Sequence, residues 1–361
     1  MTSTSDVSRK LKVIHLLGPL RPSGFERMLQ SAGRYWDQHA IEPVVVGQGD
    51  AHPFAQELQN AGYEIRSIPA IRSVAGLNSW WSLLRQEAPD VVHIHTEGAF
   101  SGAVLSARAA TPRARIVRTI HNYFFSSGWW GVKRRIQCRM SDRFVDSFIC
   151  LTPEMANHER GFGRDPAVIG NWVGDEYFDP RTRHAGPHTA ALVGNCSKVK
   201  NHEVAIEAVL HKGWQLAHLG NETGASPQEL QLLSAAENRG ALLERGVHEP
   251  RAWLNQSTVF LMPSMREGFP VALAEAIASG LPCVIADSPG LEWAASYPLV
   301  MMVPSDATSQ QWAQAIERVV NETVSAGFTQ LVATQREMAR TRLSARKGVS
   351  NYVSIYRGDR E

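Results

Sequence analysis

The sequence predicts an α/β protein built from two parallel, doubly wound sheets that are covered by helices. Short apolar runs rich in β-branched residues recur along the chain, and each is followed by a longer segment with helical spacing, which is typical of parallel sheets. The chain has 361 residues, 43% of them apolar and 20% charged, which suits two globular cores. The pattern breaks at 171–187 and then restarts, so we expect two domains, 1–172 and 173–345.

The first domain is expected to alternate strands and helices along its whole length. Its apolar runs are four to eight residues long, as buried strands are, and the segments between them carry apolar residues at helical spacing. The predicted strands are 11–17, 43–47, 63–68, 91–95, 115–120 and 147–151. The predicted helices are 25–39, 53–61, 79–87 and 99–110.

The second domain repeats this order. Its predicted strands are 189–194, 214–220, 241–244, 258–263, 282–286 and 299–303. Open α/β sheets bind ligands at the carboxyl ends of their strands, so a cleft between two such domains that face each other is the expected active site. A final segment, 348–357, has apolar residues at helical spacing and predicts an amphipathic helix.

Composition excludes several classes of protein. Thirty-seven basic and thirty-five acidic residues leave a formal charge of +2, so no global field favours a nucleic-acid partner. The cysteines Cys138, Cys150, Cys196 and Cys283 have no paired short spacing, which speaks against a zinc site and a disulfide framework and fits a reducing cytoplasm. The polar N-terminus and the lack of a run of ~18 apolar residues indicate a soluble or peripheral chain.

The most informative segment follows the strand that ends at Pro263. Pro270 is suited to the first turn of a helix and Gly280 to its C-terminal cap. Glu267 therefore lies on the loop that enters the helix. Glu275 lies just beyond the first turn, and because helical side chains lean toward the N-terminus, its carboxylate can approach the same end. Two acceptors are thus expected at one site.

The same helix start offers free N–H groups, those of Gly268 and Phe269 among them, and these favour an anion such as a diphosphate. Two carboxylates beside a phosphate would repel it unless they bind hydroxyl groups, so sugar and ribose hydroxyls are the natural partners. This combination describes a nucleotide sugar. The alternative interpretation is that Glu267 is a solvated loop residue and Glu275 a surface residue of an alanine-rich helix.

This segment resembles the retaining glycosyltransferases of family 4. Their signature is two glutamates separated by seven residues, in the order Glu-Gly-Phe, Glu-Ala and Gly-Leu-Pro. The matching residues are Pro263-Ser264, Glu267-Gly268-Phe269, Glu275-Ala276 and Gly280-Leu281-Pro282. The resemblance implies a GT-B fold of two Rossmann-like domains, with Glu267 contacting the donor sugar and Glu275 the ribose hydroxyls. It also implies that the final helix, 346–361, crosses back onto the first domain.

A second motif follows the first strand of the second domain. Family members have Gly-Arg, four further residues and Lys-Asn here, the Arg and Lys gripping the donor diphosphate. This chain has Gly194 and Asn195, then Lys200 and Asn201. The lysine matches, but the arginine is replaced by Asn195, which removes a charge-assisted contact of ~1.5 to 3 kcal/mol. Either Lys198 takes its place or the donor is held less tightly.

The first domain offers two further matches. The loop 18–26 resembles the Gly-Gly-x-Glu loop of the family, with Ser23 in place of the first glycine and Gly24 as the second. Its amides would close over the diphosphate or the acceptor. His121, after the strand 115–120, matches a histidine near the reacting sugar, which it would orient. Strand-end glycines and histidines are also common for structural reasons.

Two aromatic residues precede a basic cluster in the first domain. Trp129, Trp130, Lys133, Arg134 and Arg135 make up this segment. The sequence favours a solvated helix face. The alternative is contact with an anionic membrane surface, where each basic residue adds ~1 kcal/mol, and it would place a cytoplasmic chain at the inner membrane face.

The resemblance implies transfer of a sugar from a UDP-sugar, such as UDP-GlcNAc or UDP-glucose, to a hydroxyl of a glycan, lipid-linked or secondary-metabolite acceptor, with retention. No cofactor and no metal are expected, because Asp-x-Asp does not occur in a plausible context and Lys200 with the amides can neutralise the leaving diphosphate. A nonhydrolysing sugar-nucleotide epimerase of the same architecture is the alternative. A dinucleotide oxidoreductase is disfavoured because no Gly-x-Gly-x-x-Gly follows the first strand.

Overall fold

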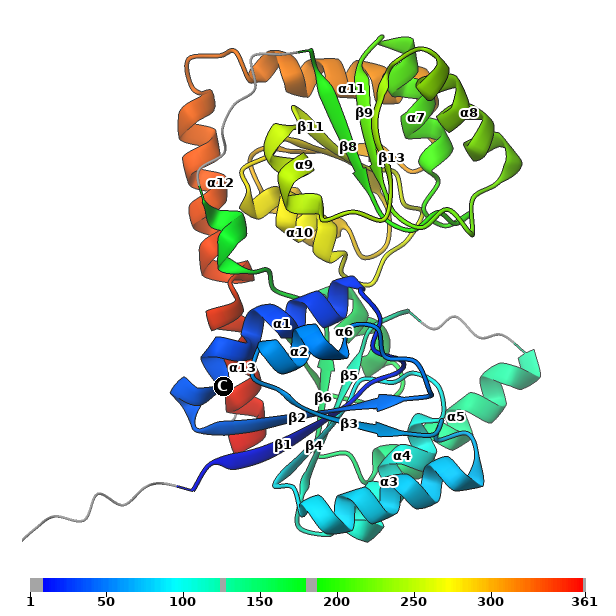
Figure 1. The fold of residues 1–361 in the computed structure, drawn as a ribbon, viewed down its shortest axis with the longest axis vertical. Helices are drawn as coiled ribbons and strands as arrows, with labels where there is room; N and C mark the ends of the chain where they lie inside the picture. The colour runs from blue at the N-terminus through cyan, green and yellow to red at the C-terminus, as the bar shows by residue number, and fades with distance from the viewer. Residues whose placement is uncertain (1–8, 124–127, 180–186, 360–361) are drawn as a thin grey trace, which may run out of the picture. The chain divides into compact units, whose positions relative to one another are not determined.

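The computed structural model describes residues 9–123, 128–179 and 187–359, and the chain divides into two units (Figure 1). One comprises Met1–Gly170 with Ala345–Glu361, and the other comprises Asn171–Ser344. Each unit has its own parallel sheet with helices packed around it. The predicted fold class, two Rossmann-like doubly wound domains, is confirmed.

The first sheet has the strand order β3-β2-β1-β4-β5-β6-β7. The strands are β1 (Leu11–Leu16), β2 (Ile41–Gln48), β3 (Glu64–Ile68), β4 (Val91–Ile94), β5 (Arg115–Ile120), β6 (Ser147–Cys150) and β7 (Pro166–Val168). The last strand was not predicted, because three residues at a sheet edge leave almost no periodic signal. The helices are α1 (Gly24–Trp36), α2 (Ala55–Asn60), α3 (Val74–Glu87), α4 (Phe100–Ala110), α5 (Gly128–Asp142), α6 (Pro153–Arg160) and α13 (Ala345–Arg357).

The second sheet has the order β10-β9-β8-β11-β12-β13. Its strands are β8 (Thr189–Val193), β9 (Gln215–Leu219), β10 (Leu242–Gly246), β11 (Val259–Met262), β12 (Cys283–Asp287) and β13 (Val300–Pro304). Its helices are α7 (His202–His211), α8 (Pro227–Asn238), α9 (Pro250–Gln256), α10 (Val271–Ala278), α11 (Ser309–Glu322) and α12 (Phe328–Leu343). Short 3₁₀ turns lie at Asp37–His39, Asp175–Phe178 and Glu292–Ser296.

Local chemistry explains where helices begin. α3 begins at Val74, five residues before the predicted start, because the side chain of Ser73 accepts a hydrogen bond from the Gly76 amide at 3.0 Å and caps the helix. α11 begins with a capping box in which Thr308 and Gln311 exchange side-chain and backbone hydrogen bonds. A single capping residue thus moves a helix boundary that apolar spacing alone does not locate.

The core of the first unit lies on both faces of its sheet. The central strands β1, β2 and β4 are buried on both faces of the sheet. Their sequences are therefore nearly continuous apolar runs rather than alternating apolar and polar residues. Trp80 on α3 is fully buried against the same apolar cluster. All four cysteines lie in the described ranges, and each is a buried thiol outside any disulfide.

The order of strands places a switch point in each sheet. The first strand of each unit lies between the second and the fourth: β1 pairs with both β2 and β4, and β8 pairs with both β9 and β11. The crossovers that follow the first and the fourth strand of each unit leave in opposite directions. The loops at the carboxyl ends of these two strands therefore diverge and leave space for a ligand. In the second unit those loops are the two segments that carry the predicted site residues.

Two observations concern the ends of the second unit and the last helix. Val173 bridges to Ser344, and its amide donates to the Leu343 carbonyl at 2.8 Å, so the chain enters and leaves this unit at one place. α13 belongs to the first unit and packs against α1. No helix in the described ranges has both the length and the apolar character that crossing a membrane requires.

Candidate functional site

Lys200 lies in the loop that joins β8 to α7. The end of β8 comes so close to the end of β9 that a Cβ at Gly220 would lie 2.0 Å from the carbonyl oxygen of Gly194, which is why glycine is needed there. The Lys200 amide donates to the Ser197 carbonyl at 2.9 Å, which forms a turn just before the helix. This turn holds the lysine side chain at the carboxyl edge of the sheet.

Glu267 lies in the loop that joins β11 to α10, and backbone hydrogen bonds hold this loop on two sides. On one side, the Met265 amide donates to the Val199 carbonyl at 2.8 Å, which links it to the Lys200 loop. On the other, the Glu267 amide donates to the Pro289 carbonyl at 2.8 Å. Gly290 has φ +87°, and a Cβ there would lie 2.1 Å from the Glu267 carbonyl oxygen. A larger residue would therefore displace the site loop.

The two loops bring Lys200 and Glu267 together. Lys200 Nζ donates to Glu267 Oε1 at 2.7 Å. The side chains are 24% and 12% exposed, respectively, so the pair lies at a partly shielded surface that a ligand can reach. Strand pairing explains the contact, because β8 and β11 are neighbours and their following loops share one sheet edge.

Glu275 lies on α10, one residue past the first turn, and is 4% exposed. No side chain caps the N-terminus of α10, and its first turn carries no acidic residue. The free amides there therefore keep their capacity to bind an anion. The loop that enters the helix is anchored at Phe269, two residues before α10. Asn171 Nδ2 donates to the Phe269 carbonyl at 2.8 Å, and the Phe269 ring stacks on Trp293 with ring centroids 4.2 Å apart. Gly268 is buried beside Phe269.

Asn195 occupies the position of the family arginine, and its side chain is exposed. Its Oδ1 accepts the Asn221 amide at 2.9 Å. The Asn221 carbonyl in turn accepts the Cys196 amide at 2.8 Å. Asn195 therefore joins the loops after β8 and β9, a structural role that the sequence did not predict.

In the first unit, His121 follows β5 and is partly buried. Its Nε2 lies 3.2 Å from His95 Nδ1, and its backbone amide donates to Glu97 Oε1 at 2.8 Å. Burial, with a smaller contribution from Arg118, lowers the pKa of His121 to about 4. The imidazole is therefore neutral near pH 7, and it can orient a ligand by hydrogen bonding but cannot act as a cationic group.

The first turn of α1 contacts this histidine through Phe25. Gly24 is the exposed first residue of α1, and the Ser23 side chain caps the helix by accepting the Phe25 amide. The Phe25 ring contacts both His95 and His121, with ring centroids 4.7 Å apart in each case. The two predicted residues of the first unit, Gly24 and His121, are thus brought together through Phe25.

Sequence reasoning missed the side chains behind His121. His95 Nε2 lies 3.1 Å from His15 Nδ1, so three rings form a chain from β1 through the end of β4 to the end of β5. His93 lies beside them and contacts Tyr356 of α13 and Thr119 at 2.7 Å each. The signal available in the sequence was the alternation His93-Ile94-His95 at the end of a strand. Residues two apart in a strand point to the same face, so both rings are expected together near one sheet edge.

The aromatic and basic segment forms α5, at the periphery of its unit (Figure 1). Four apolar residues at helical spacing along α5 are exposed: Trp129, Val132, Ile136 and Met140, at 76%, 47%, 56% and 55%. Arg135 and Arg139 are also exposed. We call these four apolar residues the α5 stripe. The side chains of Trp130, Lys133 and Arg134 lie outside the described residues.

Comparison with known families covers most of the chain. Residues 22–177 match the family model described as Glycosyltransferase Family 4. Residues 187–322 match the one described as Glycosyl transferases group 1. The two matches fall on the two sheets, and the second includes both the Lys200 loop and the Glu267 loop.

Known proteins resemble the whole chain or a large part of it. It is 25% identical over 384 residues to "Putative glycosyltransferase EpsF" of Bacillus subtilis (strain 168), covering 97% of each chain. It is 24% identical over 258 residues to the UDP-Gal:alpha-D-GlcNAc-diphosphoundecaprenol alpha-1,3-galactosyltransferase of Escherichia coli, covering 62% of this chain and 65% of that one. Its fold is similar to that of Anabaena HepE in complex with UDP-glucose, with a TM-score of 0.75, 14% identity, and coverage of 96% of this chain and 100% of that one.

Proposed function

Because the chain belongs to glycosyltransferase family 4, with a second domain of the group 1 type, we propose that it transfers a sugar from a UDP-sugar to a hydroxyl group with retention of anomeric configuration. UDP-GlcNAc and UDP-glucose are the donors to test first. The UDP-glucose complex of HepE and the UDP-Gal donor named for the Escherichia coli relative support uridine as the base.

The observation that carries the proposal is the ion pair between Lys200 and Glu267 beside the uncapped start of α10. A diphosphate needs cations and N–H donors, and Lys200 with the α10 amides supplies both. A sugar needs acceptors for its hydroxyls, and Glu267 and Glu275 supply carboxylates. The arrangement therefore fits a ligand that carries both groups.

In the proposed reaction, the bond between the anomeric carbon and the diphosphate oxygen breaks and the sugar gains oxocarbenium character. The acceptor oxygen forms its bond to the anomeric carbon on the same face, and its proton passes to the departing phosphate. Lys200 and the α10 amides stabilise the charge that builds on the diphosphate. Glu267 binds sugar hydroxyls, Glu275 binds ribose hydroxyls, and neutral His121 orients the sugar. No protein nucleophile and no catalytic metal are required.

The acceptor is proposed to be a lipid-linked diphosphate sugar. The Escherichia coli relative is named for such an acceptor, and the exposed α5 stripe with Arg135 and Arg139 suits an anionic membrane surface. An interfacial helix of this kind would bring the enzyme to an acceptor that cannot leave the lipid phase. Glycan and secondary-metabolite hydroxyls are the other acceptor classes to include.

The test is a donor and acceptor screen that measures released nucleotide and follows the product by NMR. We expect UDP release that depends on an acceptor and a product linkage with the same anomeric configuration as the donor. The rate should be the same when Mg²⁺ and Mn²⁺ are omitted. An inverted linkage would contradict the retaining mechanism. Epimerised UDP-sugar in reactions without acceptor would support the epimerase alternative instead.

A further inference from the structure

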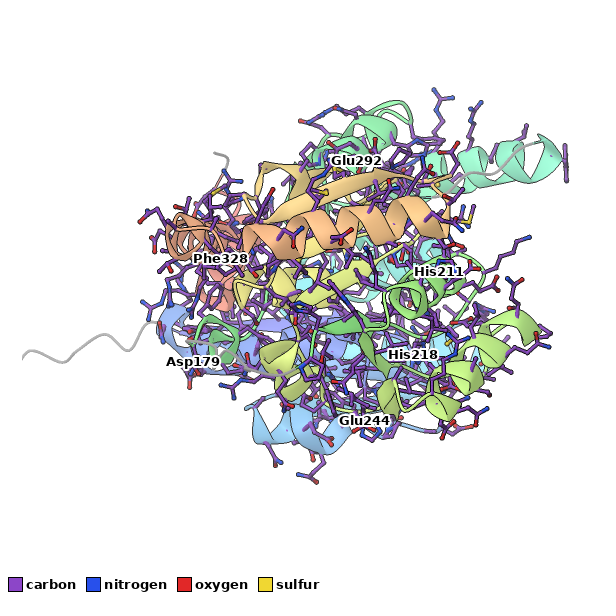
Figure 2. All side chains as sticks on the ribbon, turned by 90° about the horizontal axis from the view of Figure 1, so that it is seen from above. Asp179, His211, His218, Glu244, Glu292 and Phe328 are labelled. Atoms are coloured by element: carbon purple, nitrogen blue, oxygen red, sulfur yellow. The ribbon has the colours of Figure 1, made fainter. Side chains whose placement is uncertain are left out.

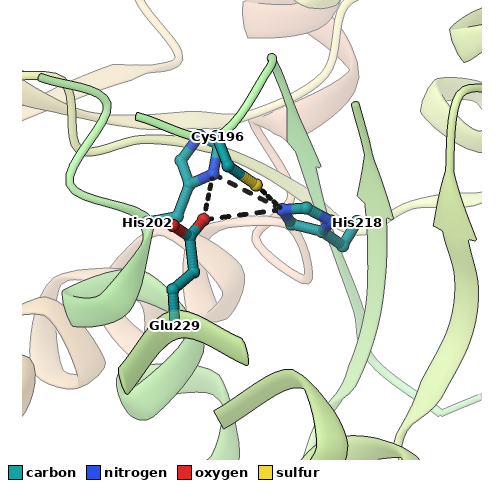
Figure 3. Close-up of side chains that lie close together, drawn as sticks. All are labelled: Cys196, His202, His218 and Glu229. Atoms are coloured by element: carbon teal, nitrogen blue, oxygen red, sulfur yellow. Dashed lines mark hydrogen bonds and ion pairs between the residues drawn. The ribbon is translucent and has the colours of Figure 1, made fainter. Parts of the chain in front are cut away.

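Four side chains with metal-binding atoms meet in the interior of the second unit (Figure 3). Cys196 comes from the loop after β8, His202 begins α7, His218 lies on β9 and Glu229 lies in the first turn of α8. The exposed fraction of each residue is 4% or less. The place of His218 in the unit can be followed in Figure 2, where the last residue of α7, His211, is also labelled.

Their facing atoms are Cys196 Sγ, His202 Nδ1, His218 Nε2 and Glu229 Oε1. All of them lie within 4.8 Å of one another. Sγ lies 3.5 Å from His218 Nε2, and the two imidazole nitrogens lie 3.4 Å apart. The Glu229 oxygen lies 2.9 Å from His202 Nδ1 and 3.9 Å from His218 Nε2. Four atoms of metal-binding type therefore lie close together, and they come from four different parts of the unit.

These separations match those around a tetrahedral zinc ion. With Zn–N bonds of about 2.0 to 2.1 Å and Zn–S bonds of about 2.3 Å, tetrahedral angles place two nitrogens roughly 3.3 Å apart and a nitrogen and a sulfur roughly 3.5 Å apart. The observed 3.4 Å and 3.5 Å agree with both values. The two carboxylate distances, 2.9 Å and 3.9 Å, lie on either side of the tetrahedral value, and a shift of Oε1 away from His202 and toward His218 would equalise them.

We propose that Cys196, His202, His218 and Glu229 bind one Zn²⁺ ion in a structural site. A thiolate and a carboxylate balance the two charges of the ion, so the loaded site is neutral, as a fully buried site should be. Borderline-soft Zn²⁺ accepts sulfur, nitrogen and oxygen ligands together. Four protein ligands leave no open position for a substrate, so the ion would stabilise the fold rather than take part in catalysis.

The surroundings of His218 support this assignment. Its Nδ1 is buried and has no hydrogen-bond partner among the described residues. Glu222 Oε1 lies 3.9 Å from it and is held by Arg245 at 2.8 Å. With Nε2 on a metal, Nδ1 carries the proton and faces this carboxylate, the arrangement that orients metal-binding histidines. Cysteine spacing does not indicate the proposed site, because its four ligands come from separate elements rather than from a short paired motif.

A buried hydrogen-bond network is the competing explanation. It would require a thiol proton on Cys196 directed at His218 and an imidazole proton on His202 directed at Glu229. The chain of rings in the first unit is an example of such a network, because both nitrogens of His93 already have hydroxyl partners. The Cys196 cluster differs in its ligands, because it adds a thiol and a carboxylate to two imidazoles, whereas the group of His15, His93 and His95 offers three imidazoles alone.

The experiment measures zinc in the full chain, purified without a polyhistidine tag or chelator after incubation with ZnCl₂ and desalting. We expect one zinc per folded chain by mass spectrometry. Cys196→Ala and His218→Ala should each lose most of it. Cys283→Ala, which removes another buried cysteine of the same unit, should keep it and serves as the matched control.

Loading the wild-type chain with Co²⁺ gives a readout that does not depend on a variant folding. Tetrahedral cobalt with one thiolate should give intense visible bands and a sulfur-to-cobalt charge-transfer band in the near ultraviolet. A folded wild-type chain without zinc, or cobalt bands typical of octahedral coordination, would overturn the proposal. Zinc that remains in both ligand variants would overturn it as well.

Discussion

Lys200 Nζ lies 2.7 Å from Glu267 Oε1 although the two residues are 67 positions apart in the chain. The pair joins a cation to an acceptor at the point where β8 and β11, adjacent in the second sheet, both end. The Glu267 carboxylate accepts a hydrogen bond from the Lys200 ammonium group. Under the proposed function, a diphosphate would compete for the same ammonium and release the carboxylate for sugar hydroxyls.

Replacing Lys200 by alanine should lower turnover by roughly 100-fold, the effect of removing one group that stabilises charge in a transition state. The loss should exceed the change in KM, because charge on the diphosphate is greatest as the bond breaks. Lys212→Ala is the control, since this lysine follows the C-terminal end of α7 and its side chain is 24% exposed, as that of Lys200 is. Steady-state kinetics with the donor identified in the screen provide the measurement. Equal kinetics for both variants would remove Lys200 from the site.

Glu275→Ala should weaken UDP binding by roughly 10-fold, because ribose hydroxyls lose a charged acceptor. Calorimetry with UDP and with 2′-deoxy-UDP separates this role from a structural one. The wild-type chain should prefer UDP, and the variant should bind the two nucleotides almost equally. Glu322→Gln, an exposed glutamate of α11, should leave both affinities unchanged. A preference for UDP that survives in Glu275→Ala would contradict the assignment.

Asn195→Arg should tighten UDP binding by restoring the cation that family members carry at this position. The gain of a charge-assisted contact, ~1.5 to 3 kcal/mol, is reduced by about 1 kcal/mol because Asn195 Oδ1 no longer accepts the Asn221 amide. The net expectation is a Kd roughly twofold to thirtyfold lower, measured by calorimetry. Asn195→Ala loses the hydrogen bond without the charge and should bind more weakly. An Asn195→Arg affinity no better than that of wild type would count against the prediction.

Buried histidines should make the first unit sensitive to acid. Burial lowers the pKa of His15 to about 3, whereas an unfolded histidine titrates near about 6.5. Below about pH 6.5 the unfolded chain therefore binds the extra proton, and the free energy of unfolding falls as the pH drops toward 3. At pH 5 this histidine alone should cost roughly 2 kcal/mol relative to pH 8.

Urea unfolding at pH 5 and pH 8 tests this dependence with His15→Gln. The variant should lose less stability between the two pH values than the wild-type chain does. His248→Gln, which removes a half-exposed histidine, should keep the wild-type dependence. The same pH dependence in all three proteins would show that His15 does not titrate as its burial requires.

The α5 stripe predicts binding to anionic vesicles. Ile136→Glu puts a negative charge among exposed apolar side chains, so it should reduce sedimentation with vesicles that contain phosphatidylglycerol by several-fold. Val324→Glu changes an exposed apolar residue of the other unit and should have no effect. Vesicles of phosphatidylcholine alone should bind the wild-type chain and the Ile136→Glu variant weakly. Equal binding of wild type and Ile136→Glu would contradict the membrane proposal.

Much of the site was predictable from local patterns. Glu267 and Glu275 lie in one continuous motif, and the strand and helix that flank them have the apolar spacing of buried elements, so their places at β11 and α10 could be expected. The place of His121 at the end of an apolar strand was predicted in the same way, whereas its role near the sugar was implied by the family resemblance. β7 could not be found, because its three residues carry too few side chains for a period to emerge.

By itself, the sequence determined the two α/β units, the order of their elements and the motif that carries the glutamates, because apolar periodicity and turn residues act over a few neighbouring positions. Only the tertiary structure decided that Lys200 pairs with Glu267, that Asn171 anchors Phe269 and that Cys196 meets His202, His218 and Glu229. Those contacts depend on which strands become neighbours in a sheet. That choice is made by packing across the whole unit, and no short segment contains it.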